Sequence, residues 1–238
     1  MGQNKAEMRL GGATLLEIAV RTLQRVCDAV IVVGEAGSGG REGWIADRWS
    51  GCGPLGGIEA ALAVGRSEWT VFLPVDMPLL PHGVLAGLMG VWRRKAEGGA
   101  QVCWAVHEGR PQPLISAVRR DLLPHVQAGL AAGDWKVRVV LERAAAQLAR
   151  AKGAPAAGAV VGTPVQIETG KGGCAVWIGD AARVEVPAQE WAARELWFAN
   201  LNSPEEFAKA RAFAGDNPVG EDDGTDESAR TADRPDRG

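Results

Sequence analysis

The chain lacks tyrosine, has few aromatic residues and contains only four cysteines, and each scarcity argues against a class of protein. Aromatic residues make up 5% of the 238 residues. The nine tryptophans form no stacking stripe, so they are typical of core and interface filling. The cysteines Cys27, Cys52, Cys103 and Cys174 lie far apart with no C-x-x-C pair. This spacing argues against a zinc ribbon and a disulfide framework and favours buried thiols in a reducing cytoplasm.

Long apolar runs and a basic surplus are also missing. No apolar run reaches the roughly 18 residues of a membrane span, and no secretory signal follows Met1. The formal net charge is −3, from 26 basic and 29 acidic residues, so the composition predicts neither a nucleic-acid nor a membrane partner. With 46% hydrophobic and 23% charged residues, the composition is that of a globular, cytoplasmic protein.

Strand and helix patterns alternate along most of the chain. Apolar, often β-branched runs predict strands over residues 29–33, 70–75, 101–106, 114–118, 165–168, 175–178, 183–186 and 197–199. Helical spacing and start signals predict helices over residues 14–27, 58–64, 81–96, 121–130, 137–148 and 204–213. The alternation predicts a three-layer α/β/α domain with a mostly parallel, Rossmann-like sheet.

The predicted domain covers residues 1–214, and an acidic tail follows it. Residues 215–238 contain eight acids and three arginines, with valine as the one large apolar residue. Such a segment cannot bury enough surface to offset its ordering entropy, so it is predicted to be disordered. Within the domain, residues 151–163 are rich in alanine and glycine and predict a loop.

Asp76 is the strongest single candidate for chemistry. It follows a buried apolar run directly and precedes Pro78. In open α/β sheets, ligands bind beyond the carboxyl ends of the strands, and a carboxylate there can hold Mg²⁺ against nucleotide phosphates. The alternative is a turn aspartate that hydrogen-bonds its own backbone.

Three further segments carry candidates, each with a plain structural alternative. The turn Gly53-Pro54-Leu55-Gly56-Gly57 can bring backbone amides close to a ligand, or can be an ordinary helix start. Lys5 can neutralise phosphate, or can be an exposed surface lysine. Asn200 and Asn202 follow a predicted strand and can face one side of the sheet, or can serve in a turn and cap.

In order and spacing, these segments resemble the molybdenum cofactor guanylyltransferases (MobA-like) of the nucleotidyltransferase fold. Met1 to Ala6 is similar to the end of the family loop L-A-G-G-x-S-x-R-M-G-x-D-K-A, and Gly53 to Gly57 to its G-P-L-x-G. Asp76-Met77-Pro78 matches D-x-P, Gly109 to Leu114 matches G-R-P-x-P-L, and Asn200 to Glu206 matches N-x-N-T-P-E-[ED]. The resemblance covers about residues 1–150 and 196–213, with residues 151–195 longer than usual.

The resemblance implies transfer of GMP from GTP to the terminal phosphate of molybdenum-molybdopterin, with release of pyrophosphate. Lys5 and Asp76 would be catalytic, and Asp76 would hold Mg²⁺. The implied nucleotide contacts are Gly2, Lys5, Gly34, Gly53, Pro54, Leu55, Gly56, Gly57 and Asp76, and the implied acceptor contacts are Arg110, Asn200 and Asn202. Molybdenum cofactor insertion proteins and molybdoenzymes are candidate partners. His107 is expected on a loop surface, because this chemistry needs no histidine base.

Two rival functions stay open at this point. One is another nucleotidyltransferase of the same fold, using CTP or a different phosphorylated acceptor. The other is a non-catalytic nucleotide-binding module, since the chain carries only the second half of the family's signature loop. The resemblance also predicts that about 15 to 20 upstream codons encode a β-branched strand of ~5–6 residues and the rest of that loop.

Overall fold

Strands and helices alternate in the structure as the sequence predicts. The structure is a computed structural model that describes residues 4–34, 44–167, 175–179 and 182–216, so Gly2 lies outside the described residues. The strands are β1 (Arg9–Leu10), β2 (Ala13–Thr14), β3 (Val32–Gly34), β4 (Trp44–Ala46), β5 (Trp69–Phe72), β6 (Val102–His107), β7 (Arg110–Arg119), β8 (Val160–Ile167), β9 (Ala175–Ile178) and β10 (Ala182–Glu185). The α-helices are α1 (Leu15–Gln24), α2 (Pro54–Val64), α3 (His82–Glu97), α4 (Leu123–Ala131), α5 (Val137–Ala151), α6 (Ala188–Ala192) and α7 (Pro204–Asp216). Short 3-10 helices are η1 (Lys5–Glu7), η2 (Arg120–Leu122) and η3 (Arg194–Leu196).

The main sheet is mixed, although the sequence favours a mostly parallel one. Its strand order is β10-β9-β8-β6-β7-β5, and only β6 and β8 pair in parallel within it. A separate parallel pair joins β3 to β4. The antiparallel pairs come from β7, which returns beside β6 through a tight hairpin, and from β9 and β10. Continuous apolar runs are typical of parallel strands that are covered on both faces, but in this sheet such runs also occur in antiparallel pairs, because helices cover both faces.

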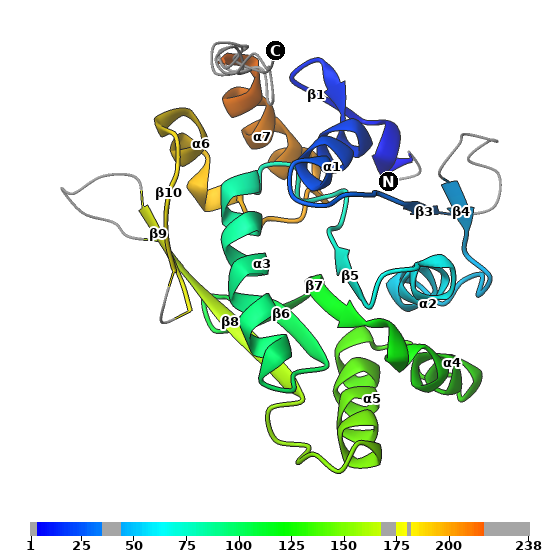
Figure 1. Ribbon diagram of the computed structural model, residues 1–238. Coiled ribbons are helices and arrows are strands. Elements are labelled where there is room, and N and C mark those ends of the chain that lie inside the picture. Colours follow the sequence, from blue (N-terminus) through cyan, green and yellow to red (C-terminus); the bar gives the residue numbers. More distant parts are fainter. Residues whose placement is uncertain (1–3, 35–43, 168–174, 180–181, 217–238) are drawn as a thin grey trace, which may run out of the picture.

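Helices cover both faces of the sheet, which confirms the three-layer α/β/α arrangement (Figure 1). Along β6, Cys103 and Ala105 pack in a cluster with α3, whereas Val102 and Trp104 pack in a cluster with α2, α4 and α5. These four side chains are 0–4% exposed. Alternate residues of a strand point to opposite faces, so β6 is central to two apolar cores.

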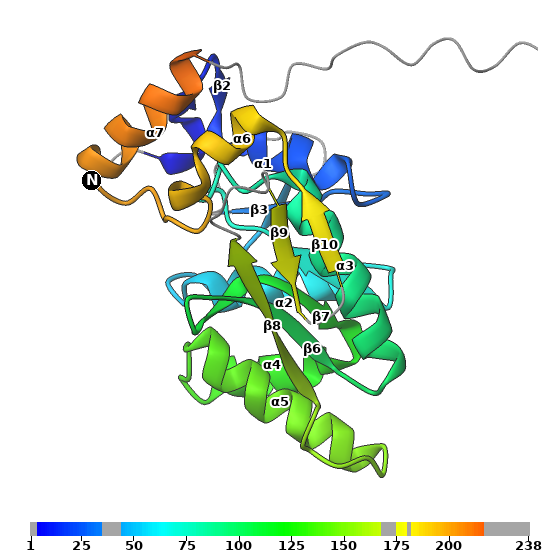
Figure 2. The same ribbon diagram turned by 90° about the vertical axis from the view of Figure 1, so that its left-hand side faces the viewer.

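A third apolar cluster joins the two ends of the described chain. Leu10 and Leu15 from the N-terminal region pack with Leu201, Phe207 and the rest of α7. Figure 2 shows α1 and α7 together at one end of the molecule, with α4 and α5 at the other. This packing brings residues near position 5 close to residues near position 202.

Two helices begin with the capping boxes that their sequences predict. Thr14 accepts a hydrogen bond from the amide of Glu17, which accepts one in return from the amide of Thr14. Ser203 and Glu206 form the same reciprocal pair at the start of α7. Each box satisfies amides that a helix start leaves free.

Several predicted boundaries are wrong. Trp197-Phe198-Ala199 is not a strand but follows η3, where Trp197 is 0% exposed. The predicted loop over residues 151–163 ends at Val160, where β8 begins its parallel pairing with β6. Residues 151–195 therefore supply three strands of the main sheet. The helix α7 runs to Asp216, past the predicted start of the tail, and the rest of the tail lies outside the described residues.

Candidate functional site

Three of the candidate residues meet, although they lie far apart in the sequence. The Lys5 ammonium lies 3.4 Å from a carboxylate oxygen of Asp76, across 71 sequence positions. The same ammonium also donates a hydrogen bond to the amide oxygen of Asn202, 197 positions away. A lysine, an aspartate and an asparagine thus form one polar cluster beyond the end of β5.

Backbone contacts position this cluster. Asp76 lies in a turn after β5, and its carbonyl accepts a hydrogen bond of 2.9 Å from the amide of Leu201. Leu201 is 1% exposed and belongs to the third apolar cluster, whereas Asn200 and Asn202 on either side are exposed. The expected strand is absent at these asparagines, but the alternation of exposed and buried side chains is retained. Apolar burial of Leu201 therefore fixes where Asn202 meets Lys5.

The cluster is partly open to solvent. The side chains of Lys5 and Asp76 are 33% and 22% exposed, so a ligand can reach both. Next to them, the amides of Asn202 and Ser203 donate hydrogen bonds of 2.9 and 2.8 Å to Glu206. These bonds hold the pKa of the Glu206 carboxyl below its ordinary value. The Glu206 carboxylate therefore stays ionised, and its hydrogen bonds are made to the backbone amides of Asn202 and Ser203.

The oxygen donors of the cluster suit a magnesium ion that is completed by a ligand. The described residues contain no group of three or more His, Cys, Asp or Glu side chains able to hold a metal. Asp76 offers a carboxylate, and Asn202 presents an amide oxygen to the same lysine. Mg²⁺ is often bound by one or two carboxylates together with substrate phosphates and water, so this donor set fits such an ion.

A second group of candidates gathers at the start of α2. The carbonyl of Gly34 at the end of β3 accepts a hydrogen bond of 3.0 Å from the amide of Asp47. The carboxylate of Asp47 accepts one of 2.7 Å from the amide of Trp49 and lies against Gly56. Asp47 therefore links Gly34 to the turn over residues 53–57. Sequence reasoning missed Asp47, since only the fold brings it to this turn.

Two glycines in this turn have separate physical requirements. Gly53 has φ +64° and ψ −154°, a conformation that is essentially restricted to glycine. At Gly56, a Cβ atom would lie 2.6 Å from both carboxylate oxygens of Asp47. Pro54 occupies the first turn of α2, no side chain caps this helix, and Leu55 is fully buried beneath the turn. The turn thus presents backbone close to an uncapped helix start, where amide groups attract anions.

A buried carboxylate on α2 connects this helix to Arg48 before the turn and to Gln127 on α4. Glu59 is 0% exposed and forms an ion pair with Arg48, and it accepts a hydrogen bond of 2.7 Å from Gln127 on α4. A buried charge is tolerated only when it is paired and hydrogen-bonded. This network therefore fixes the segment before the turn against two helices.

The third group of candidates lies at the β6–β7 hairpin and is separate from the first. The side chain of Arg110 is exposed and makes no hydrogen bond or ion pair with any other described residue. It pairs in register with His107 across a turn in which Glu108 and Gly109 both have positive φ. The structure records no hydrogen bond between the side chain of Arg110 and Asn200 or Asn202.

His107 links this hairpin to the asparagine segment, contrary to the loop-surface expectation. Its ring stacks on Phe198 with centroids 4.3 Å apart and planes at 15°, two residues before Asn200. Its Nδ1 atom is buried and has no partner among the described residues, and burial lowers its pKa. Sequence reasoning missed this role because the contact depends on tertiary packing of a half-buried strand end.

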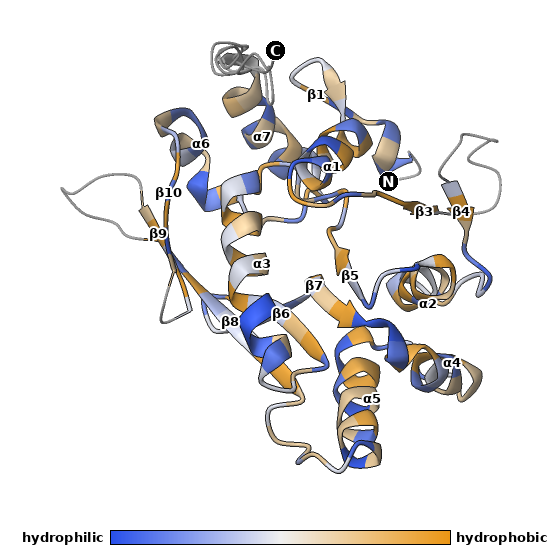
Figure 3. Cartoon of the chain, viewed as in Figure 1, coloured by the Kyte–Doolittle hydropathy of each residue, from blue (hydrophilic) through white to orange (hydrophobic). Residues whose placement is uncertain are grey.

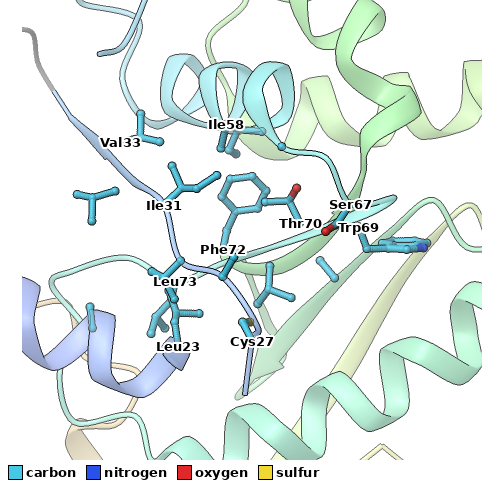
Figure 4. A pocket seen from close by; sticks show the side chains of 18 of the residues that line it. Leu23, Cys27, Ile31, Val33, Ile58, Ser67, Trp69, Thr70, Phe72 and Leu73 are labelled. Atoms are coloured by element: carbon cyan, nitrogen blue, oxygen red, sulfur yellow. The ribbon is translucent and has the colours of Figure 1, made fainter. Parts of the chain in front are cut away.

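An apolar hollow of about 980 Å³ lies beside the first two groups. Its lining includes Asp76 and, from the turn, Pro54 and Gly57. Figure 4 shows side chains from α1, α2, β5 and the segment leading into β3 around this space, Ile31 and Phe72 among them. Asp76 of the polar cluster and two residues of the α2 turn thus border the same hollow.

A family model describes this region of the chain. Residues 1–153 match the MobA-like NTP transferase domain. A "probable molybdenum cofactor guanylyltransferase" of Deinococcus radiodurans is 32% identical over 141 residues, which span 58% of this chain and 70% of that protein. A molybdenum cofactor guanylyltransferase of Photobacterium profundum is 35% identical over 86 residues, or 36% of this chain. The chain covers only 42% of the length of that second relative.

A solved structure has the same fold. Molybdopterin-guanine dinucleotide biosynthesis protein A from Archaeoglobus fulgidus aligns with a TM-score of 0.59 at 19% identity. The alignment covers 90% of this chain and 92% of that one. At this identity the likeness concerns the fold alone. Among the described residues, no helix is both long and apolar enough to cross a membrane.

Proposed function

The chain belongs to the MobA-like NTP transferase family, and from this premise we propose that it transfers GMP from GTP to the terminal phosphate of molybdenum-molybdopterin. A phosphate oxygen of the acceptor attacks the α-phosphorus of GTP and forms a new P–O bond. The bond between the α-phosphorus and the bridging oxygen breaks, and pyrophosphate leaves. The product is molybdopterin guanine dinucleotide. The names of the relatives in Deinococcus and Photobacterium support this choice of substrates.

The meeting of Lys5, Asp76 and Asn202 is the observation that carries the proposal. Phosphoryl-type transfer asks the protein mainly for positioning and for charge neutralisation. A partly exposed ammonium and a carboxylate 3.4 Å apart, with an amide alongside, provide both charges in one place. An exposed surface lysine would have no reason to be held by residues 71 and 197 positions away.

Each group of residues then has a role. Lys5 neutralises triphosphate oxygens, and Asn202 keeps its ammonium directed toward Asp76. Asp76, with the amide oxygen of Asn202 nearby, would hold Mg²⁺. When bound, that ion neutralises the negative charge of the triphosphate and of the departing pyrophosphate.

The α2 turn takes the nucleoside. Gly34 and residues 53–57 contribute backbone groups, since glycine allows close approach, and Asp47 holds these two segments together. The Arg110 guanidinium is exposed on a hairpin and is unpaired among the described residues, and it suits the acceptor phosphate because its fork can bind two oxygens at once. Asn200 is exposed, follows by two residues the Phe198 ring on which His107 of the hairpin stacks, and precedes Asn202 by two, so we assign it to the acceptor side as well.

Product analysis tests the proposal. The full chain is incubated with molybdenum-molybdopterin, Mg²⁺ and either GTP or CTP, and both pyrophosphate and dinucleotide are quantified by chromatography with mass spectrometry. We expect guanine dinucleotide and pyrophosphate in equal amounts, with GTP preferred. A preference for CTP would transfer the chain to cytidylyl chemistry. Binding of GTP with no pyrophosphate release would reduce it to a nucleotide-binding module.

A further inference from the structure

The six-stranded sheet ends at β10, the last strand in its order among the described residues. This strand pairs with β9 along its whole length, from Ala182 to Glu185. Figure 2 shows β9 and β10 following β8 at this end of the sheet. The outer side of an edge strand presents a row of backbone N–H and C=O groups to which another extended segment can pair. The edge of β10 is therefore a surface to which a further strand can be added.

The side chains of β10 alternate between the two faces of the sheet. On the inner face, Ala182 and Val184 are half-buried against the apolar cluster that contains α3, and Val186 just after the strand is 5% exposed. On the outer face, the side chains of Arg183 and Glu185 are 40% and 82% exposed and form an ion pair of 2.9 Å. Figure 3 shows both apolar and hydrophilic colours along this strand. The edge thus has an apolar face and a face with two charges of opposite sign.

Charges on an edge strand commonly prevent pairing with a second copy, because like charges come to lie opposite one another. In β10 the outcome depends on the register. Two strands related by a two-fold axis run antiparallel, and directly opposite residues must point to the same face, so a shift by one residue is excluded. A register centred on Arg183 places two arginines opposite each other, and one centred on Glu185 places two glutamates opposite each other.

The register centred on Val184 is self-complementary. Each Arg183 keeps Glu185 of its own strand beside it and has Glu185 of the second copy directly opposite, so the four charges alternate in sign around the axis. On the inner face, the two copies of Val184 meet at the axis, and Ala182 lies opposite Val186. Exposed ion pairs add little affinity, but charge complementarity fixes the register. The backbone and the apolar face then supply the attraction.

Helix α3 covers the inner face of β10 and has an open flank beside it. A Cβ atom at Gly87 would lie 2.7 Å from Val184 and 2.5 Å from Ile178, so glycine allows this helix to pack closely on β9 and β10. Gly83, Gly87 and Gly90 lie on one stripe of the helix, and a Cβ atom at Gly90 would meet nothing within 4 Å. A two-fold axis perpendicular to the sheet keeps both α3 helices on the same side, where their flanks add contact area to the strand edges.

We propose that the outer edge of β10 binds β10 of a second copy of this chain, in an antiparallel pairing centred on Val184. The two six-stranded sheets become one continuous sheet, and the contact closes on itself, so no third copy is added. The paired strand is only four residues long. The interface is therefore small, and we expect a reversible dimer with a dissociation constant on the order of 10–100 µM.

Sedimentation velocity of the full chain tests the association itself. Between about 1 µM and about 500 µM, a range that brackets the expected constant, the protein should pass from monomer to dimer. A monomer over the whole range would overturn the proposal. Hydrogen exchange at the two concentrations then locates the contact: amides of residues 182–187 should exchange more slowly in the dimer, while a peptide over the central strand β7 stays unchanged. A dimer without slower exchange at residues 182–187 would place the contact elsewhere and overturn the proposal.

Charge reversal tests the register. Arg183→Glu places glutamate opposite glutamate, and Glu185→Arg places arginine opposite arginine, so each variant alone should dimerise at least ~10-fold more weakly. An equimolar mixture of the two variants should restore the dimer, because every opposite pair again has opposite charges. The double variant Arg183→Glu/Glu185→Arg should dimerise like the wild type. Dimers that ignore the single reversals, or a mixture that stays monomeric, would overturn the proposed pairing.

A reversal on another surface is the matched control. Arg138→Glu on α5 breaks the exposed ion pair with Glu142 and should leave the dissociation constant unchanged; equal weakening by this variant would contradict the assignment to β10. Circular dichroism checks that each variant is folded. If Arg183→Glu does not fold, the concentration dependence of exchange at residues 182–187 in the unsubstituted chain decides. None of these readouts needs turnover, so they can fail while the proposed guanylyl transfer holds.

Discussion

Gly56 offers the sharpest test of how the α2 turn is built. A Cβ atom at this position would lie 2.6 Å from both carboxylate oxygens of Asp47 and 2.9 Å from its Cγ. The whole carboxylate would have to move and would lose its 2.7 Å hydrogen bond from the amide of Trp49. Losing a hydrogen bond to a charged group costs about 1.5–3 kcal/mol. Replacing glycine by alanine in a helix recovers up to about 1 kcal/mol.

We therefore expect Gly56→Ala to lower the free energy of unfolding by roughly 0.5–3 kcal/mol, which for a chain of this size lowers Tm by about 1–12 °C. The matched control is Gly57→Ala, where the added Cβ meets only Val33 at an ordinary 3.7 Å. This control should keep or slightly raise Tm in differential scanning calorimetry. Adding Asp47→Ala to Gly56→Ala should recover part of the loss, because the obstructing carboxylate is gone. If Gly56→Ala is as stable as Gly57→Ala, the proposed contact between Asp47 and the turn is wrong.

Three further changes have defined outcomes. His107→Phe should keep the stack on Phe198 and leave kcat and KM for the acceptor nearly unchanged. His107→Ala should raise KM for the acceptor while KM for GTP stays constant. Equal effects of the two substitutions would contradict a role of His107 in stacking. Folding lowers the pKa of the Glu206 carboxyl below its ordinary value of 4.5, so its contribution to stability is fully present above about pH 4.5 and is lost as the pH falls through the folded pKa. The difference in unfolding free energy between wild type and Glu206→Gln should therefore shrink as the pH falls below about 4.5. A difference that stays constant over this pH range would refute the linkage. Removal of residues 217–238 should change Tm and turnover by less than the measurement error, since their composition is acidic with a single valine; a loss of several degrees would show that the tail docks.

Local signals predicted much of this fold. The capping boxes at Thr14 and Ser203 depend on residues three positions apart, so sequence alone identifies them. Buried strands such as β6 and β9 were recognisable because their apolar runs are bounded by turn residues. Features that depend on tertiary packing could not be predicted from the sequence. The run Trp197–Ala199 is buried after a 3-10 turn, and an apolar run of three residues does not distinguish that from a strand.

Those residues of the candidate site that lie in local sequence motifs could also be predicted. Lys5, Asp76 and Asn202 occur in short motifs with fixed order, and the structure brings them together. Asp47 and His107 have no local signal, because the first is defined by its approach to Gly56 and the second by its stack on Phe198. The antiparallel neighbours in the main sheet were likewise missed, since strand direction depends on connections rather than on side-chain pattern.

The rate of guanylyl transfer in Asp76→Asn tests the central claim most directly, against Asp134→Asn as the control. The two aspartates are closely matched: Asp76 is 22% exposed and 3.4 Å from Lys5, and Asp134 is 26% exposed and 3.0 Å from Arg143. Both substitutions keep size and remove one paired charge. The account predicts that Asp76→Asn lowers the rate of pyrophosphate release by at least ~10²-fold, comparable to the loss of one electrostatic stabiliser, while Asp134→Asn retains nearly full activity. Comparable rates for the two variants would contradict the assignment of the Lys5–Asp76–Asn202 cluster as the site of transfer.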